Sequence, residues 1–262
     1  MSLQRLLDIM EKLRSPEGCP WDREQTHQSL KRNLLEETYE VLEAIDTNDP
    51  AILVDELGDV LLQVVFHAQI GKESGTFTMD DVINAVSDKL VRRHPHVFAD
   101  VQVDSVSDVL ENWDAIKKTE KASENRTSLL DGVPKEFPAL MRAEKIQKKA
   151  AKVGFEWDDI HGAIDKFHEE LGEFRDAIQE NDPEHLTEEL GDLLFALVNI
   201  ARYVKVDPEL ALQQSTAKFV QRFHYIEKQA EHSNRNLEDM SLEEMDKLWN
   251  EAKAYFRKNP HS

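Results

Sequence analysis

A stretch of 36 residues occurs twice in this chain, and this duplication limits what the chain can fold into. Residues 34–69 and 167–202 align at a constant offset of 133 without a gap, and sixteen of the 36 aligned positions are identical. Unrelated sequences of ordinary composition would share about two such positions. Because solenoid repeats usually measure about 20–50 residues, a period of 133 residues indicates two copies of one domain.

The boundary between the two copies is predicted from a change in composition. Residues 119–138 are polar at first and then carry Gly132, Pro134 and Pro138, which is typical of a linker. We therefore expect an N-terminal domain at residues 1–118, a linker at 119–138 and a C-terminal domain at 139–262. A chain of 262 residues is long enough for two domains of ordinary size.

Each copy is expected to be helical. In the first copy, the predicted helices cover residues 24–46 and 50–72, and Asp49-Pro50 lies between them. Aspartate suits the N-cap of a helix and proline suits its first turn, and Asp182-Pro183 repeats this pair. Nine glycines and nine prolines are few for this length, and no strand-like alternation of polar and apolar residues occurs. The predicted fold class is therefore all-α, without a substantial β-sheet.

Charge and cysteine content limit the class of protein. The formal net charge is −20, whereas a nucleic-acid-binding protein usually shows a basic patch, so we expect no nucleic-acid partner.

The longest apolar stretch, residues 60–70, is far shorter than the ~20 residues of a membrane-spanning helix, and the N-terminus lacks the apolar core of a signal peptide. We therefore expect no membrane partner. A single cysteine, Cys19, cannot form an internal disulfide, which favours a reducing cytoplasm.

Acidic residues that recur in both copies form the candidate functional pattern. In the first copy, Glu37 and Glu40 lie three positions apart, as do Glu56 and Asp59 on the next helix. Residues at this spacing share one face of a helix. Glu40 precedes Asp49 by nine residues and Glu56 follows it by seven, so an antiparallel hairpin would bring both pairs to a similar height. The second copy repeats the pattern with Glu169, Glu170, Glu173, Glu189 and Asp192.

Several carboxylates that converge without a counter-ion repel one another, and an all-oxygen set of ligands favours Mg²⁺, Mn²⁺ or Ca²⁺ over zinc. The alternative is a solvated acidic helix face, which is common in a chain with 52 acidic residues. Two observations disfavour it. The pattern occurs twice at one spacing, and the helix that carries Glu56 and Asp59 is apolar on nearly every side, which predicts that it is buried. Gly58 and Gly191 interrupt these helices at a cost of about 1 kcal/mol relative to alanine, which predicts the close approach of a neighbour or a ligand.

The duplicated pattern Glu-Glu-x-x-Glu with Glu-x-x-Asp, in a chain of this length, resembles the MazG family of nucleoside triphosphate pyrophosphohydrolases. Three further segments carry the resemblance: residues 19–22 (CPWD), residues 92–98 (RRHPHVF) and residues 153–157 (VGFEW). The similarity extends over essentially the whole chain. It implies two four-helix-type domains joined by a linker, a homodimer, and Mg²⁺-dependent hydrolysis of a nucleoside triphosphate to the monophosphate and pyrophosphate.

The resemblance also assigns roles to individual residues. It gives Glu169 and Glu170 as catalytic carboxylates, and it gives as ligands of Mg²⁺, for which Mn²⁺ is a substitute, Glu170, Glu173, Glu189 and Asp192. It gives as substrate contacts Lys218, Arg222 and Trp249. The first copy keeps the corresponding metal ligands Glu37, Glu40, Glu56 and Asp59, together with the cations Lys89 and Arg93. Trp113 is the expected counterpart of Trp249. The family favours the second copy as the catalytic one, although the residues of the first look equally complete.

The expected reaction is attack of a metal-activated water at the α-phosphorus, with pyrophosphate as the leaving group. No Walker phosphate-binding loop is present in the sequence. Two other classes compete with this hypothesis. One is a non-catalytic helical regulator that binds a nucleotide or a partner protein. The other is a ferritin-like di-iron bundle, which needs Glu-x-x-His on two helices, whereas only residues 24–27 offer one.

Overall fold

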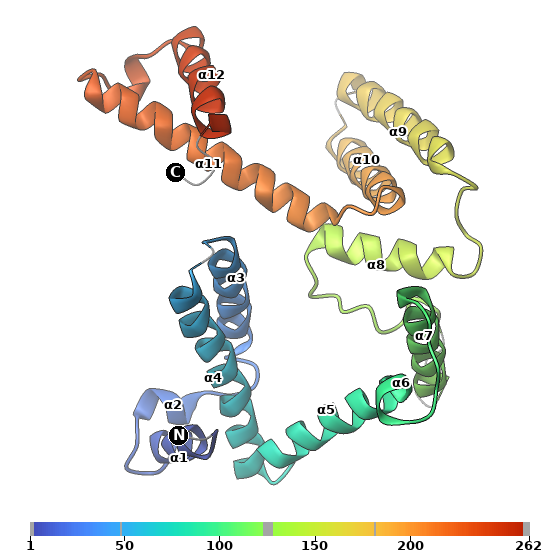
Figure 1. Cartoon of the computed structure of the whole chain (residues 1–262). Helices are drawn as coiled ribbons and strands as arrows, with labels where there is room; N and C mark the ends of the chain where they lie inside the picture. The colour runs from blue at the N-terminus through green and yellow to red at the C-terminus, as the bar shows by residue number, and fades with distance from the viewer. Residues whose placement is uncertain (1–2, 48, 123–127, 181, 259–262) are drawn as a thin grey trace. The chain divides into compact units, whose positions relative to one another are not determined.

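The computed structural model describes residues 3–47, 49–122, 128–180 and 182–258. All the regular elements in these ranges are helices, which confirms the all-α prediction. The chain divides into two compact units, Met1–Glu124 and Asn125–Ser262, and each is considered by itself (Figure 1). The linker at 119–138 stays a prediction, because residues 119–122 still belong to a helix and residues 123–127 lie outside the described ranges.

The first unit is built around a long helical hairpin. Its helices are α1 (Leu3–Leu13), α2 (Pro20–Glu24), α3 (Lys31–Thr47), α4 (Pro50–Ser74), α5 (Met79–Arg93), α6 (Pro95–Phe98) and α7 (Val106–Ala122). Helices α3 and α4 form the hairpin, and α1 packs against α4. Helix α5 leaves the end of α4 and packs against α6 and α7 (Figure 1).

The second unit repeats the hairpin. Its helices are α8 (Ala139–Ala151), α9 (Ile160–Glu180), α10 (Pro183–Tyr203), α11 (Pro208–His232) and α12 (Leu242–Lys258), with a short 3₁₀ turn η1 (Leu237–Asp239) before α12. Helix α10 packs against α9 and α8. Helix α12 packs on α11, along the part of α11 that is remote from α9 and α10 (Figure 1).

The two hairpins turn in the way that the Asp-Pro pairs predict. Asp49 caps α4 by accepting a hydrogen bond from the backbone N–H of Ala51 at 2.8 Å. Asp182 caps α10 in the same manner through Glu184 N–H at 3.0 Å. In both helices proline occupies the first turn, where its missing N–H costs nothing. The same local chemistry therefore sets the start of α4 and α10, and with it the height at which their acidic residues lie.

The hairpin helices are less buried than their apolar sequences predict. The core of the first unit contains Met10, Leu30, Val65 and Phe66. Other apolar side chains of α4 and α10 stay exposed: Val54, Leu57, Leu61, Leu190, Leu194 and Leu197. The expectation that these helices are buried all round is therefore wrong for the single chain, because α4 packs against α3 and α1 on one part of its surface while the rest of its apolar side chains stay uncovered.

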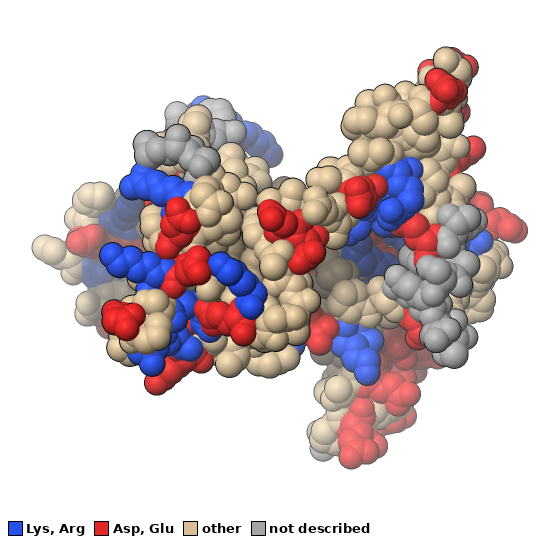
Figure 2. All heavy atoms as spheres, turned by 90° about the horizontal axis from the view of Figure 1, so that it is seen from below, with Lys and Arg blue, Asp and Glu red and all other residues tan. Residues whose placement is uncertain are grey.

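The prediction that glycine allows a neighbouring helix to approach is wrong within each unit, and the approach of a ligand stays a prediction. A Cβ atom placed on Gly58 or Gly191 would meet nothing within 4 Å. No neighbouring helix therefore requires glycine at these positions in the described structure. On the face shown in Figure 2, Lys and Arg side chains are interspersed with Asp and Glu side chains, and no continuous basic surface is formed. No helix in the described ranges combines the length and the apolar character needed to cross a membrane.

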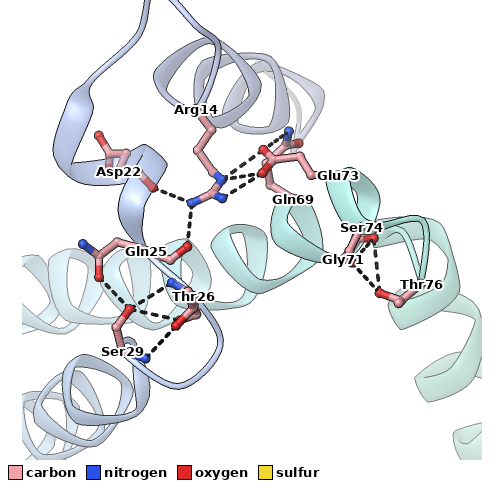
Figure 3. Close-up of polar contacts among 10 residues, drawn as sticks. All are labelled: Arg14, Asp22, Gln25, Thr26, Ser29, Gln69, Gly71, Glu73, Ser74 and Thr76. Atoms are coloured by element: carbon pink, nitrogen blue, oxygen red, sulfur yellow. Dashed lines mark hydrogen bonds and ion pairs between the residues drawn. The ribbon is translucent and has the colours of Figure 1, made fainter.

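The helix predicted at residues 24–46 is interrupted. The structure ends α2 at Glu24 and begins α3 at Lys31. Thr26 N–H donates to Ser29 Oγ at 2.9 Å, and Ser29 N–H donates to Thr26 Oγ1 at 3.2 Å (Figure 3). These side chains take over backbone hydrogen-bonding groups and so compete with a continuous helix.

Candidate active site

The second hairpin brings three carboxylates together. Glu170 and Glu173 lie one turn apart on α9, and Glu189 lies on α10; one carboxylate oxygen of each is within 4.8 Å of the others. Glu170 is buried, Glu189 is half-buried and Glu173 is exposed. The predicted meeting of the two acidic pairs at one height is thus confirmed for these three residues. Asp192, the fourth expected ligand, lies outside this group and is exposed.

The first hairpin forms a similar group from a different selection of residues. Glu37 of α3 and Glu56 and Asp59 of α4 have carboxylate oxygens within 4.8 Å of one another. Glu40 is not a member of this group, although its charge raises the pKa of Glu37 and Glu56. Each hairpin therefore gathers three of its four expected ligands, and the positions shared by both are Glu37 and Glu170 on the first helix and Glu56 and Glu189 on the second.

Crowding shifts the protonation of these groups. The pKa of Glu37 is raised, first by desolvation and then by the charges of Asp59 and Glu40. Desolvation and the charge of Glu40 likewise raise the pKa of Glu56. In the second unit, desolvation and the charge of Glu170 raise the pKa of Glu173. Carboxylates that repel one another in this way are stabilised in their charged form by a divalent cation.

The second hairpin carries two cationic or ionisable partners that the first lacks. Lys166 Nζ lies 2.6 Å from Glu169 Oε1 and 2.8 Å from Glu170 Oε1, and these bonds raise the pKa of Lys166. His185 lies 2.8 Å from Glu180 and 3.1 Å from Glu189. The bond with Glu180, above all, raises the pKa of His185.

The corresponding positions in the first hairpin are occupied by Asn33 and Ile52. Neither Lys166 nor His185 was predicted from the sequence to belong to the site. Their spacing could have shown them, because Lys166 lies four positions before Glu170 and His185 lies four positions before Glu189, so that each shares a helix face with its partner.

The donor set of the second hairpin fits a hard divalent cation. The Oε2 atom of Glu189 is buried and has no hydrogen-bond partner in the described part of the chain. A buried, unpaired carboxylate oxygen is costly, and a cation would satisfy it. All the donors offered by Glu170, Glu173 and Glu189 are oxygens, which is the ligand type that Mg²⁺ and Mn²⁺ prefer.

The expected substrate-binding cations lie on the long helices that leave the hairpins. The Cζ atom of Arg222 on α11 lies 5.3 Å from the ring centroid of Trp249 on α12. Arg93 of α5 has the same 5.3 Å relationship to Trp113 of α7, which supports Trp113 as the counterpart of Trp249. Lys218 and Lys89 lie one helical turn before Arg222 and Arg93 on the same two helices.

The two arginines differ in their surroundings. Arg93 Nη2 lies 2.6 Å from Glu120 Oε2, and Arg92 also binds this carboxylate at 2.7 Å. These two arginines lower the pKa of Glu120 to about 2. In the first unit, Arg93, which was expected to bind the substrate, is therefore already paired with a carboxylate of the same unit.

Within the second unit, the expected substrate-binding cations do not lie at the carboxylate group. Trp249 lies on α12, which packs against the part of α11 remote from α9 and α10 (Figure 1). Arg222 contacts this tryptophan and so lies at the same part of α11. Lys218, Arg222 and Trp249 are thus separated from Glu170, Glu173 and Glu189 within the second unit.

The fold and the two acidic groups define a duplicated helical protein with one carboxylate cluster in each hairpin. The MazG nucleotide pyrophosphohydrolase domain matches the sequence twice, at residues 25–98 and 161–226. The chain therefore belongs to the MazG family of nucleotide pyrophosphohydrolases, which are hydrolases.

Similar proteins cover nearly the whole chain. It is 49% identical over 251 residues to the nucleoside triphosphate pyrophosphohydrolase/pyrophosphatase MazG of Thermotoga maritima, which covers 96% of this chain and 95% of that protein. It is 47% identical to the nucleoside triphosphate pyrophosphohydrolase of Escherichia coli, with 96% and 97% covered. The uncharacterized protein YabN of Bacillus subtilis is 56% identical over 96% of this chain, which spans about half (51%) of YabN.

Proposed function

We propose that this protein hydrolyses nucleoside triphosphates to a nucleoside monophosphate and pyrophosphate, that Mg²⁺ is its cofactor and that the reaction takes place at the second hairpin. The observation that carries the proposal is the convergence of Glu170, Glu173 and Glu189, with one buried, unpaired oxygen on Glu189. The names of the relatives from Thermotoga maritima and Escherichia coli support the same activity. A chain with one cysteine, Cys19, and no continuous basic surface on the face in Figure 2 fits a cytoplasmic enzyme without a nucleic-acid partner.

Different residues of the second unit have different roles in the proposed reaction. Glu170, Glu173, Glu189 and Asp192 would hold Mg²⁺, with Mn²⁺ as a substitute. When bound, the metal supplies positive charge that offsets the charge of the triphosphate and favours the ionised form of water. Glu169 accepts the proton of the attacking water, since it is exposed and its Oε1 atom lies 2.6 Å from Lys166 Nζ, which holds the carboxylate in place. Glu170, which shares the same lysine, is the alternative base.

Attack at the α-phosphorus breaks its bond to the bridging oxygen, and the electron pair leaves with pyrophosphate. Lys218 and Arg222 bind the phosphate oxygens and stabilise the charge that develops on this leaving group. Trp249 positions the Arg222 guanidinium through the contact of its ring with Cζ.

We infer that the working form is a homodimer, for two reasons. The apolar side chains Leu190, Leu194 and Leu197 of α10 are exposed in the single chain, and a second copy would cover them. Within the second unit, Arg222 contacts Trp249 of α12 and lies apart from the carboxylates of α9 and α10, so a site that uses both sets must take one from outside this unit, and a second copy of the unit would supply it.

Product analysis tests the proposal. The full chain is incubated with Mg²⁺ and each nucleoside triphosphate, and the products are separated by anion-exchange chromatography. Monophosphate with pyrophosphate supports the proposal, and diphosphate with phosphate contradicts the assigned bond. No turnover would favour the non-catalytic regulator. Glu189→Ala and Asp192→Ala are expected to abolish turnover while helix content stays unchanged, whereas the exposed control Glu231→Ala keeps full activity.

A further inference from the structure

His185 joins the two helices of the second hairpin beside the carboxylate group of Glu170, Glu173 and Glu189. It belongs to the first turn of α10, and its Nε2 atom lies 3.1 Å from Oε1 of Glu189, one turn further along the same helix. Its Nδ1 atom lies 2.8 Å from Oε2 of Glu180, the last residue of α9. No step of the proposed reaction uses this imidazole.

Both ring nitrogens of His185 donate hydrogen bonds. An ionised carboxylate only accepts, so the contacts with Glu180 and Glu189 require a proton on Nδ1 and on Nε2, and the ring is then the imidazolium. The carboxylate of Glu180, whose side chain is 58% exposed, offsets this positive charge from the end of α9. The link therefore supplies Glu189 with a donor while it adds no net charge to the group. Because neither nitrogen keeps a lone pair, His185 itself is not expected to bind a metal ion.

The bond to His185 occupies one oxygen of Glu189 and leaves the other for a cation. Oε1 is bound by the ring, while Oε2 is buried and has no hydrogen-bond partner among the described residues. The Glu189 side chain is only 12% exposed, and rotation of its carboxylate away from this position would break the bond to the ring. We propose that His185 is a positioning residue, which holds the carboxylate of Glu189 with Oε2 free for a divalent cation. This inference rests on the proposed function.

The first hairpin lacks this link. Ile52 takes the place of His185, and its side chain has no donor. Thr47 takes the place of Glu180, and its hydroxyl donates to a backbone carbonyl of its own helix at 2.7 Å. The link is therefore specific to the second unit, in which we place the reaction. Because the first hairpin forms without it, variants that remove the link are expected to fold.

A partner of this kind acts on the affinity for the metal ion. A hydrogen bond to a ligand carboxylate restricts its rotation before the cation binds, so less conformational freedom is lost on binding. Loss of such a partner usually lowers metal affinity by about 10- to 100-fold. The same loss is expected when the bond between His185 and Glu189 is removed, and it is measurable without any substrate.

The decisive variants separate the two nitrogens of the ring. The amide nitrogen of glutamine stands at about the place of Nε2, and that of asparagine at about the place of Nδ1, so His185→Gln keeps the donor to Glu189 and His185→Asn loses it. The full chain is titrated with Mn²⁺ by calorimetry in a Glu56→Gln background, which disables the carboxylate group of the first unit. We expect binding to weaken by about tenfold or more in His185→Asn and in His185→Ile, and to stay near that of the reference protein in His185→Gln. His232→Ile, at an exposed position of α11, is the control and keeps the reference affinity.

Glu180 supplies a second test, because its carboxylate reaches Glu189 through the ring. Glu180→Ala should weaken Mn²⁺ binding when His185 is present and should have no further effect in His185→Ile, so the two losses are not additive. In steady-state kinetics, His185→Ile should raise the Mg²⁺ concentration for half-maximal rate by about tenfold or more, while kcat at saturating Mg²⁺ stays near the wild-type value. A residue that only stabilised the fold would show neither rescue by excess Mg²⁺ nor a difference between His185→Gln and His185→Asn.

The outcomes separate the positioning role from the proposed function. An unchanged Mn²⁺ affinity in folded His185→Ile, or an equal loss in His185→Gln and His185→Asn, overturns the role of His185 while the hydrolase function stands. A wild type without turnover overturns the hydrolase function, and the Mn²⁺ affinities of the variants then decide the role of His185 alone. A reference protein that binds no Mn²⁺ overturns both. If circular dichroism shows that His185→Ile is unfolded, the comparison of His185→Gln with His185→Asn decides.

Discussion

The Arg222 guanidinium lies 5.3 Å from the ring centroid of Trp249 and links α11 to α12. A cation held over an indole ring is attracted by about 0.5–2 kcal/mol. Replacement of Trp249 by leucine removes this attraction and leaves Arg222 free to move. We expect Trp249→Leu to raise KM for the nucleoside triphosphate by about 2- to 30-fold.

Arg222→Ala should raise KM further, because it removes the charge as well. Lys228→Ala serves as the control, since Lys228 lies exposed on the same helix. Steady-state kinetics provide the measurement. A wild-type KM in both Trp249→Leu and Arg222→Ala would contradict the placement of these residues at the substrate.

Substitution of Glu189 tests metal binding separately from turnover. Its Oε2 atom is buried and unpaired, and Glu189→Gln keeps the size of the side chain while it removes the negative charge. We expect the variant to bind Mg²⁺ and Mn²⁺ at least tenfold more weakly, because a neutral amide is a poorer ligand than a carboxylate. Calorimetric titration with each metal tests this without reference to turnover. The exposed control Glu231→Gln should bind as the wild type does, and equal affinity in Glu189→Gln would refute the assignment.

Local spacing was enough to predict much of this structure. The interval of three residues between Glu170 and Glu173 and the Asp182-Pro183 turn bring the acidic pairs of the two helices to one height, and both are features of the sequence alone. The same spacing gathers Asp59 in the first hairpin and Glu173 in the second, so the exact membership of each group could not be predicted. The break between α2 and α3 escaped prediction because Thr26 and Ser29 bind each other's backbone, an alternative that helical periodicity does not reveal.

Features that depend on tertiary packing could not be predicted from the sequence. An apolar stretch such as that around Leu57 indicates burial, but it does not say whether the same chain or a second chain provides the cover. The spacing of Lys218 and Arg222 places them on one helix face, but it does not predict the direction in which α11 extends from the hairpin. Gln147 of α8 reaches the backbone carbonyl of Phe195 because α8 packs against α10, and no sequence motif predicts this contact.

Crowding of the carboxylates predicts a pH-dependent stability. The pKa values of Glu37, Glu56 and Glu173 are raised above 4.5 in the folded protein. The folded state therefore binds protons that the unfolded state has released, and this contribution to stability is lost as the pH rises through the raised pKa values. In EDTA, we expect these groups to lower Tm as the pH rises from about 4.5 towards neutrality.

Added Mg²⁺ should reverse this loss, because it binds the ionised carboxylates. The gain in Tm on addition of Mg²⁺ is expected to grow over the same pH interval. Differential scanning fluorimetry with EDTA or Mg²⁺ across the interval gives the measurement. Glu120 and Glu244, whose pKa values are lowered to about 2, change protonation only below it. A gain from Mg²⁺ that does not depend on pH would argue against the crowded clusters as the binding sites.

The exposed apolar face of α10 predicts the oligomeric state. Leu197 is 49% exposed in the single chain. If a second copy covers it, Leu197→Lys places a charge in an apolar interface and shifts the protein from dimer to monomer. Size-exclusion chromatography with light scattering measures the shift. Thr187→Lys adds the same charge at an exposed polar position of α10 and should leave the dimer intact. A dimer of unchanged strength in Leu197→Lys would show that this face is not the interface.

Phe66 and Asn199 occupy matching positions in the repeat, but Phe66 is packed in a core whereas Asn199 lines a cavity. Substitutions at the two positions should therefore differ in their effect on the free energy of unfolding. Phe66 is packed against Trp21 and Arg14 within the core of the first unit, so Phe66→Ala leaves a cavity and should destabilise that unit by about 3–5 kcal/mol. Asn199 lines an existing cavity, so Asn199→Ala removes polar contacts and leaves no new hole in a packed core. Its cost should stay near 1 kcal/mol, the usual worth of a hydrogen bond. Urea unfolding of the full chain, followed by circular dichroism, compares the two variants. Equal destabilisation would mean that Asn199 is packed as tightly as a core residue.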